Sequence, residues 1–208
     1  MTRLLLISGS TSDWSPQTSA LRTAVRLVPP GVVAEVYGGL RHLPAFVPGE
    51  AAPARALAVR EQIAAADAVL FCTPEYAGSL PGSLKNLLDH VVAGGDLGGK
   101  PVAWLSVASP GQDEGARLTL ETVLAQCNAR LLHAACQRIP LVPHAVDGQG
   151  MVTDAQLHQA LADMLQTLSR TLTQVQTRQA PSWQINSSLF PTLSREGDRP
   201  TFRPRRPF

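Results

Sequence analysis

Residues 73–86 read TPEYAGSLPGSLKN and connect a short apolar run, residues 68–72, to a segment with helical spacing of leucine and valine, residues 84–92. This order of strand, glycine- and proline-rich loop and helix is typical of an open α/β sheet, in which ligands bind beyond the carboxyl ends of the strands. Gly78 and Gly82 let the backbone approach a flat ligand. A plain strand-to-helix connection uses the same residue types, so composition alone leaves both interpretations open.

The order of the residues favours a ligand site. The loop is similar to the second flavin-binding loop of NAD(P)H-dependent FMN reductases, which are flavodoxin-like flavoproteins and read close to TPEYNGSxPGxLKNxLD. The chain matches this pattern through Asp89, except that Ala77 replaces an asparagine. The resemblance extends over residues 3–180 and implies ring contacts from Pro74, Glu75, Tyr76, Ala77 and Gly78. We expect Glu75 to face loop backbone or a partner subunit as a positioning carboxylate.

The start of the chain predicts a phosphate site. Residues 4–7 read LLLI, which is typical of a buried strand, and residues 8–19 contain seven serines and threonines in twelve positions before a helical pattern. Amides at a helix N-terminus, together with hydroxyls, are a common anion site. Neither GxGxxG nor GxxxxGK[ST] is present, so a single phosphate monoester fits better than a dinucleotide or a triphosphate. Ordinary helix capping by Ser15 or Thr18 is the alternative.

The family's phosphate loop reads approximately GSxRxxSxNT. The resemblance therefore implies phosphate contacts from the matching residues of this chain, which are Ser10, Ser12, Ser15, Gln17 and Thr18. Ser12 stands where the family has an arginine, which removes a bidentate charged partner, and Gln17 stands where it has asparagine. Arg22 on the next helix is a candidate replacement, although a solvated helix face is the interpretation favoured for it.

A third loop follows the apolar run at residues 101–108. Residues 109–115 read SPGQDEG, and the resemblance implies that Ser109 and Gly111 lie near the flavin ring. A plain turn with Asp113 as the helix cap explains the same residues about as well.

The alternation of apolar runs with helical patterns predicts an α/β fold. We expect a flavodoxin-like three-layer sandwich, with a five-stranded parallel sheet of order 2-1-3-4-5 and helices on both faces. The five strands are expected near residues 4–7, 32–37, 68–72, 101–108 and 130–134. Right-handed crossovers then bring the loops after strands one, three and four to one edge of the sheet.

Composition sets the limits of the prediction. The chain has 208 residues, of which 44% are hydrophobic, and its three cysteines and five histidines show no metal-ligand spacing. No secretory signal or membrane span is expected, and apolar surroundings for the cysteines indicate a reducing cytoplasm. His90 is expected at the surface. Residues 1–180 form the predicted FMN-binding domain. Residues 181–208 hold five arginines against two acidic residues, and five prolines, so we expect an extended or disordered extension and not a nucleic-acid site.

The resemblance implies an NAD(P)H-dependent FMN reductase with FMN, not FAD, and with NADPH or NADH as the hydride donor. The acceptor would be a flavin, a quinone or another small molecule, and no side chain is expected to be catalytic because the cofactor supplies the chemistry. A flavin-binding electron carrier or interaction protein without nicotinamide turnover is the alternative. The wide apolar stripe at residues 83–92 favours a homodimer or homotetramer, unless it packs on the sheet.

Overall fold

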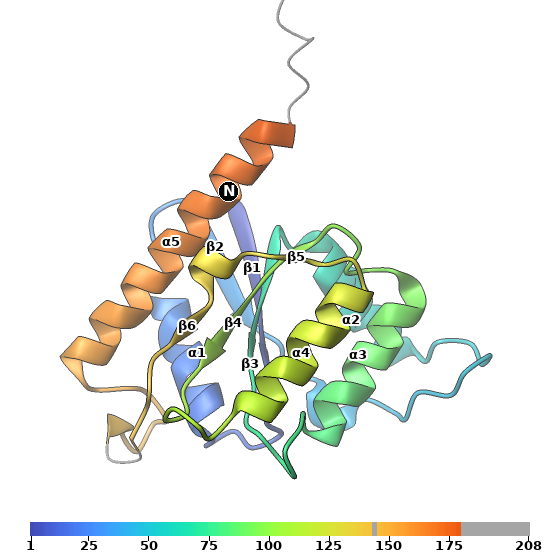
Figure 1. The fold of residues 1–208 in the computed structure, drawn as a ribbon, viewed down its shortest axis with the longest axis horizontal. Helices are drawn as coiled ribbons and strands as arrows, with labels where there is room; N and C mark the ends of the chain where they lie inside the picture. The colour runs from blue at the N-terminus through green and yellow to red at the C-terminus, as the bar shows by residue number, and fades with distance from the viewer. Residues whose placement is uncertain (143–144, 180–208) are drawn as a thin grey trace, which may run out of the picture.

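The computed structural model describes residues 1–142 and 145–179 of the chain. A central parallel sheet lies between two layers of helices (Figure 1). The strands are β1 (Thr2–Ser8), β2 (Val32–Val36), β3 (Ala68–Cys72), β4 (Pro101–Ser106), β5 (Arg130–Leu131) and β6 (Gln137–Arg138). The helices are α1 (Pro16–Arg26), α2 (Ala54–Ala65), α3 (Gly82–Gly94), α4 (Glu114–Gln126) and α5 (Ala155–Gln179), with 3-10 turns η1 (Leu40–His42) and η2 (His133–Ala135). The predicted extension, residues 181–208, lies outside the described residues.

The sheet has the order β2-β1-β3-β4-β5, and all of its pairs are parallel. The predicted flavodoxin-like fold is therefore confirmed. The prediction of a continuous fifth strand at residues 130–134 is wrong, because β5 ends at Leu131 and the chain turns through η2 before β6 pairs with the end of β4. Leu132 and Ala135 are buried in the same core as the apolar face of α5, and η2 packs against that helix.

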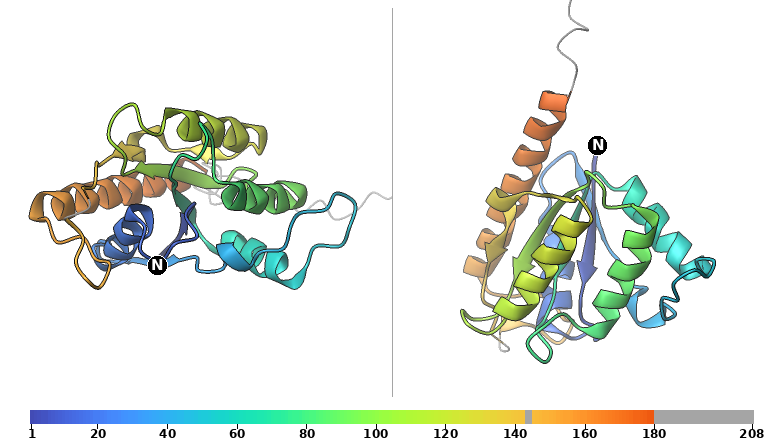
Figure 2. Two further views of the ribbon diagram at one scale, coloured as in Figure 1. Left: turned by 90° about the horizontal axis from the view of Figure 1, so that it is seen from below. Right: turned by 45° about the vertical axis from the view of Figure 1, so that its right-hand side comes forward.

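Alternation along β1 divides the core into two halves. Leu4 and Leu6 face the side covered by α1 and α5, whereas Leu5 and Ile7 face the side covered by α2, α3 and α4. Figure 2 shows these two helical layers on opposite sides of the sheet. Burial of each such leucine or isoleucine side chain contributes about 1.5–3 kcal/mol to the free energy of folding. The loops at the carboxyl edge therefore extend from a well-packed sheet.

Helix α3 uses most of its apolar stripe inside the protomer, and only Val92 of the stripe is exposed, at 42%. Leu84, Leu87, Leu88 and Val91 are all completely buried against the sheet. His90, expected at the surface, is only 4% exposed, so that prediction is wrong. The chain before α2 folds over this part of α3: His90 Nε2 lies 3.0 Å from the Pro44 carbonyl oxygen, and Phe46 meets the imidazole edge to face.

None of the described helices is both long enough and apolar enough to cross a membrane. The described residues also include no group of three or more histidine, cysteine, aspartate or glutamate side chains that could hold a metal ion.

Candidate functional site at the carboxyl edge of the sheet

The three loops singled out in the sequence are in direct contact. The Gly9 amide donates to the Cys72 carbonyl at 2.8 Å, and a Cβ built on Gly9 would lie 2.2 Å from Thr73 Oγ1. A Cβ built on Gly115 would lie 2.1 Å from the Gly78 carbonyl oxygen. Glycine is required at both positions because no side chain fits between the loops. The structure thus brings the loops after β1, β3 and β4 together at one edge.

Glu75 joins the second loop to helix α4. Its Oε2 accepts a hydrogen bond from the Ala116 amide at 3.0 Å, in the first turn of α4. A carboxylate at this position is favoured by the unpaired amides and the dipole of a helix N-terminus. Ser79 and Thr119 place their hydroxyl oxygens 3.3 Å apart and add a second link. Glu75 therefore faces backbone, as expected, and positions the loop.

Residues 76–79 form a tight reverse turn. Tyr76 and Ser79 exchange two backbone hydrogen bonds of 2.9 and 3.0 Å, and the two central residues, Ala77 and Gly78, have φ values of 50° and 71°. Two positive φ values are typical of a type I′ turn, in which asparagine followed by glycine is preferred. The Ala77 and Gly78 amides have no acceptor within the described ranges, and Tyr76 is 57% exposed beside them. The turn offers donors and an aromatic ring to a ligand.

The first loop is shaped by its own hydroxyls. The amides of Ser10, Ser12 and Trp14 each donate to the hydroxyl two residues earlier, at 3.2–3.3 Å, so the side chains of Ser8, Ser10 and Ser12 fold the backbone into successive turns. In this arrangement the intervening amides of Thr11 and Asp13 are left without an acceptor among the described residues. These two amides are available to an anion.

Ser15 and Thr18 connect this loop to the start of α1 by hydrogen bonds. Ser15 is the N-cap of α1 and accepts a hydrogen bond from the Thr18 amide at 3.2 Å, which is the capping role weighed against phosphate binding. The Ser15 hydroxyl donates to Thr18 Oγ1, which itself donates to the Ser12 carbonyl at 3.0 Å. Gln17 is 8% exposed, and its side-chain amide makes no hydrogen bond to any described residue.

Two arginines lie over the same loop. Arg22 donates to the Asp13 carbonyl at 2.8 Å, so it is engaged with the loop and not on the free solvated face favoured from the sequence. Arg41, from η1 after β2, donates to the Thr11 carbonyl at 2.5 Å and to the Asp13 carboxylate at 2.9 Å. The sequence analysis did not identify Arg41 as a site residue. The one feature that could have indicated it is its position after the carboxyl end of β2. A pocket of about 180 Å³ lies between these arginines and the loop hydroxyls.

The third loop is held by an ion-pair network. Asp113 is almost fully buried and pairs with Arg138 of β6 at 2.8 Å. It stands at the N-cap of α4, as the alternative interpretation held, but its side chain makes no capping hydrogen bond. Glu114 pairs with the same guanidinium and accepts from the Gly111 amide at 3.2 Å. Desolvation acts to raise the pKa of Glu114, but the hydrogen bonds from Gly111, Arg138 and Asp113 outweigh it and hold that pKa below its usual value.

Gly111, with a φ of 85°, therefore gives its amide to Glu114, while Ser109 accepts from the Gln112 amide at 3.2 Å through its carbonyl. Behind this loop, the Ser106 hydroxyl is buried without a partner in the described chain. Cys72 is also buried here, and burial raises the pKa of its thiol above the usual value, so the group stays neutral. Because the Ser106 hydroxyl and the Cys72 thiol are both buried, neither suits nucleophilic catalysis.

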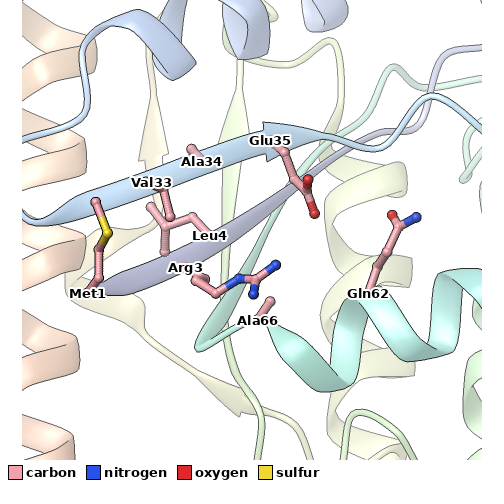
Figure 3. A pocket seen from close by; sticks show the side chains of 8 residues that line it. All are labelled: Met1, Arg3, Leu4, Val33, Ala34, Glu35, Gln62 and Ala66. Atoms are coloured by element: carbon pink, nitrogen blue, oxygen red, sulfur yellow. The ribbon is translucent and has the colours of Figure 1, made fainter.

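The residues present fit flavin mononucleotide. The first loop offers two unpaired amides, several hydroxyls and two guanidiniums to a phosphate, and the turn at residues 76–79 offers two amides and a tyrosine ring to a flat heterocycle. A separate pocket of about 260 Å³ lies beside the start of β1, the middle of β2 and the end of α2 (Figure 3). Arg3, Glu35 and Gln62 line that hollow, which is remote from the three loops.

Comparison with known proteins agrees with this geometry. A family described as NADPH-dependent FMN reductase matches residues 2–136. The chain is 35% identical over 173 residues to an NAD(P)H-dependent FMN reductase of Pseudomonas aeruginosa, covering 80% of this chain and 92% of that protein. It is 32% identical over 121 residues to a quinone reductase of Escherichia coli K12, covering 55% of this chain and 64% of that protein. Among solved structures, the flavoenzyme NAD(P)H:(acceptor) oxidoreductase FerB of Paracoccus denitrificans superposes with a TM-score of 0.71 at 22% identity, over 84% of this chain and 98% of that one.

Gly115→Ala should separate the second and third loops. The new Cβ would collide with the Gly78 carbonyl, so backbone has to move, and we expect a loss of about 1–3 kcal/mol in the free energy of unfolding and at least tenfold weaker FMN binding. Urea unfolding and flavin fluorescence titration measure the two effects. Gly82→Ala is the matched control, because a Cβ there meets nothing within 4 Å. Equal behaviour of the two variants would contradict the close contact.

Ala77→Asn should stabilise the protein by ~0.5–1 kcal/mol, because alanine in the left-handed region is strained and asparagine tolerates it. The free energy of unfolding in urea is the measurement. Ala77→Val is the opposite test, since a β-branched side chain at this φ should lower stability. An asparagine variant less stable than the wild type would show that the turn does not have the described conformation.

Proposed function

Because the chain belongs to the NADPH-dependent FMN reductase family, we propose that it passes a hydride from NADPH or NADH through bound FMN to a flavin, a quinone or another small acceptor. The observation that carries the proposal is the direct contact of three loops at one sheet edge, with unpaired amides at both ends of the site. FMN, when bound, supplies the ring that accepts and donates the hydride, so the protein has to bind, orient and expose it.

The first loop would hold the phosphate. The amides of Thr11 and Asp13 lack acceptors in the part of the chain that is described, and the hydroxyls of Ser10 and Ser12 lie in the same pocket. Ser15 and Thr18 support this arrangement through the Ser12 carbonyl and the start of α1. In this proposal they set the shape of the loop more than they bind the phosphate.

The turn at residues 76–79 would hold the ring. Amides of Ala77 and Gly78 can donate to the edge of the ring that becomes negative on reduction, and Glu75 keeps the turn in place through α4. Alanine at position 77 offers no side-chain donor, so this side of the site is less polar than an asparagine would make it. The exposed Tyr76 leaves room for a flat acceptor, which supports quinones and flavins as substrates.

The proposal predicts a flavoprotein that turns over nicotinamide. Purified protein should release FMN, without adenine, on heating, and anaerobic NADPH should bleach the flavin absorbance. Steady-state NADPH oxidation with a soluble quinone and with free FMN then identifies the acceptor class. Bound FMN that NADPH does not reduce would favour an electron carrier, whereas FAD or no flavin would contradict the assignment of the site.

We also propose a homodimer or homotetramer, in a cytoplasmic setting that the three unpaired cysteines support. Most of the α3 stripe is used within the protomer, so the support comes from two exposed apolar side chains of the same helical layer, Val92 of α3, 42% exposed, and Leu118 of α4, 56% exposed. Exposed apolar surface of this kind is typical of interfaces.

Leu118→Lys should therefore shift the protein toward the monomer, because a charge in a buried interface is costly. Light scattering at micromolar concentration measures the mass. Val33→Lys, at an exposed valine on the opposite edge, is the control and should keep the wild-type mass. A wild-type protein of monomer mass would contradict the assembly.

A further inference from the structure

Arg41 reaches the phosphate loop from a different element. It follows β2 in the chain, yet its guanidinium binds the Thr11 carbonyl and the Asp13 carboxylate in the loop after β1. Arg22 approaches from α1 and binds the Asp13 carbonyl, with its Nη2 3.7 Å from the carboxylate. Two cations thus converge on a single carboxylate at the mouth of one pocket.

The pocket between them suits an oxyanion. Ser8, Ser10, Ser12 and Thr18 line it together with both arginines, in a volume of about 180 Å³. Ser10 is only 7% exposed and its hydroxyl accepts from the Ser12 amide, but its proton has no acceptor among the described residues. Because Ser10 lines the pocket, its hydroxyl proton is available to an anion bound there.

Asp13 is the group that now neutralises the two arginines. Its carboxylate is 60% exposed, and exposed ion pairs contribute little to stability. A phosphate monoester carries up to two charges and three acceptor oxygens, so it competes well for a guanidinium fork. The two guanidiniums can therefore release the Asp13 carboxylate, which they bind weakly, and bind a phosphate monoester in its place.

We propose that Arg41, assisted by Arg22, binds a phosphate monoester at this loop, and that Asp13 occupies the two guanidiniums until the phosphate arrives. This inference rests on the proposed function and explains how a loop with Ser12 at the arginine position still supplies a cation. Two sources offer the same chemistry: the 5′-phosphate of FMN and the 2′-phosphate of NADPH. The position beside the free Thr11 and Asp13 amides is compatible with either.

The first arm compares FMN with riboflavin, which lacks the phosphate, by fluorescence titration of the flavin-free full-length protein. Arg41→Gln should weaken FMN by about tenfold or more and leave riboflavin unchanged, since a charged hydrogen bond to phosphate is lost. Arg41→Lys should restore part of the loss. Asp13→Asn should tighten FMN several-fold, and added salt should reduce all these differences. Arg26→Gln removes the same charge at the exposed far end of α1 and should behave as wild type.

The second arm measures kcat/KM for NADPH and NADH on the FMN-loaded enzyme. If Arg41→Gln leaves FMN affinity intact but lowers the preference for NADPH by about tenfold, the bound group is the 2′-phosphate and the proposal stands. Equal losses of FMN and riboflavin affinity would overturn the proposal, because Arg41 would then have only a structural role. No change in flavin affinity or in the preference for NADPH would also overturn it, because Arg41 would then bind no phosphate. A wild-type protein that binds neither flavin would overturn the proposed function and this inference with it.

Discussion

The closeness of the three loops at the carboxyl edge is the constraint on which the rest of the site depends. Gly9 lies against Thr73, and Gly115 lies against the Gly78 carbonyl, at separations that leave no room for a Cβ. Backbone packed against backbone puts amides from distant segments within one small region. The main-chain donors at this edge thus have positions set by the fold, and they would lose no side-chain entropy on binding a ligand.

Polar side chains at this edge mainly position the backbone. Glu75 binds an amide of α4, Thr18 donates to the Ser12 carbonyl, and Arg138 holds the loop after β4 through Asp113. The buried carboxylate of Asp113 is tolerated because it has a charged partner. Such an arrangement suits a site whose cofactor carries the reaction, since what it needs from the protein is a rigid set of donors.

Two carboxylates of the chain occupy donors that an acceptor-rich ligand would also use. Asp13 holds the guanidiniums at one end of the site, and Glu114 holds the Gly111 amide at the other. Both carboxylates are exposed, whereas the guanidiniums they bind, those of Arg22, Arg41 and Arg138, belong to residues of α1, η1 and β6. The described conformation keeps these donors satisfied by internal acceptors.

Local pattern in the sequence determined the first four strands, most of the helices and the identity of the three loops. Period-two and period-3.6 burial and the order of residues 73–89 are properties of neighbouring positions. Tertiary structure alone decided the burial of His90, the break after Leu131, and the partners of Asp113 and Arg41. Each of these depends on a segment more than twenty residues away in the chain or on packing against α5. Ser15 could be a cap or a ligand from its neighbours, and the structure shows that it caps α1 and donates its proton to Thr18 Oγ1. Long-range contacts of this kind leave no periodic pattern in the sequence. The physical reason is that they depend on how whole helices and strands pack against one another, which brings residues distant in the chain together.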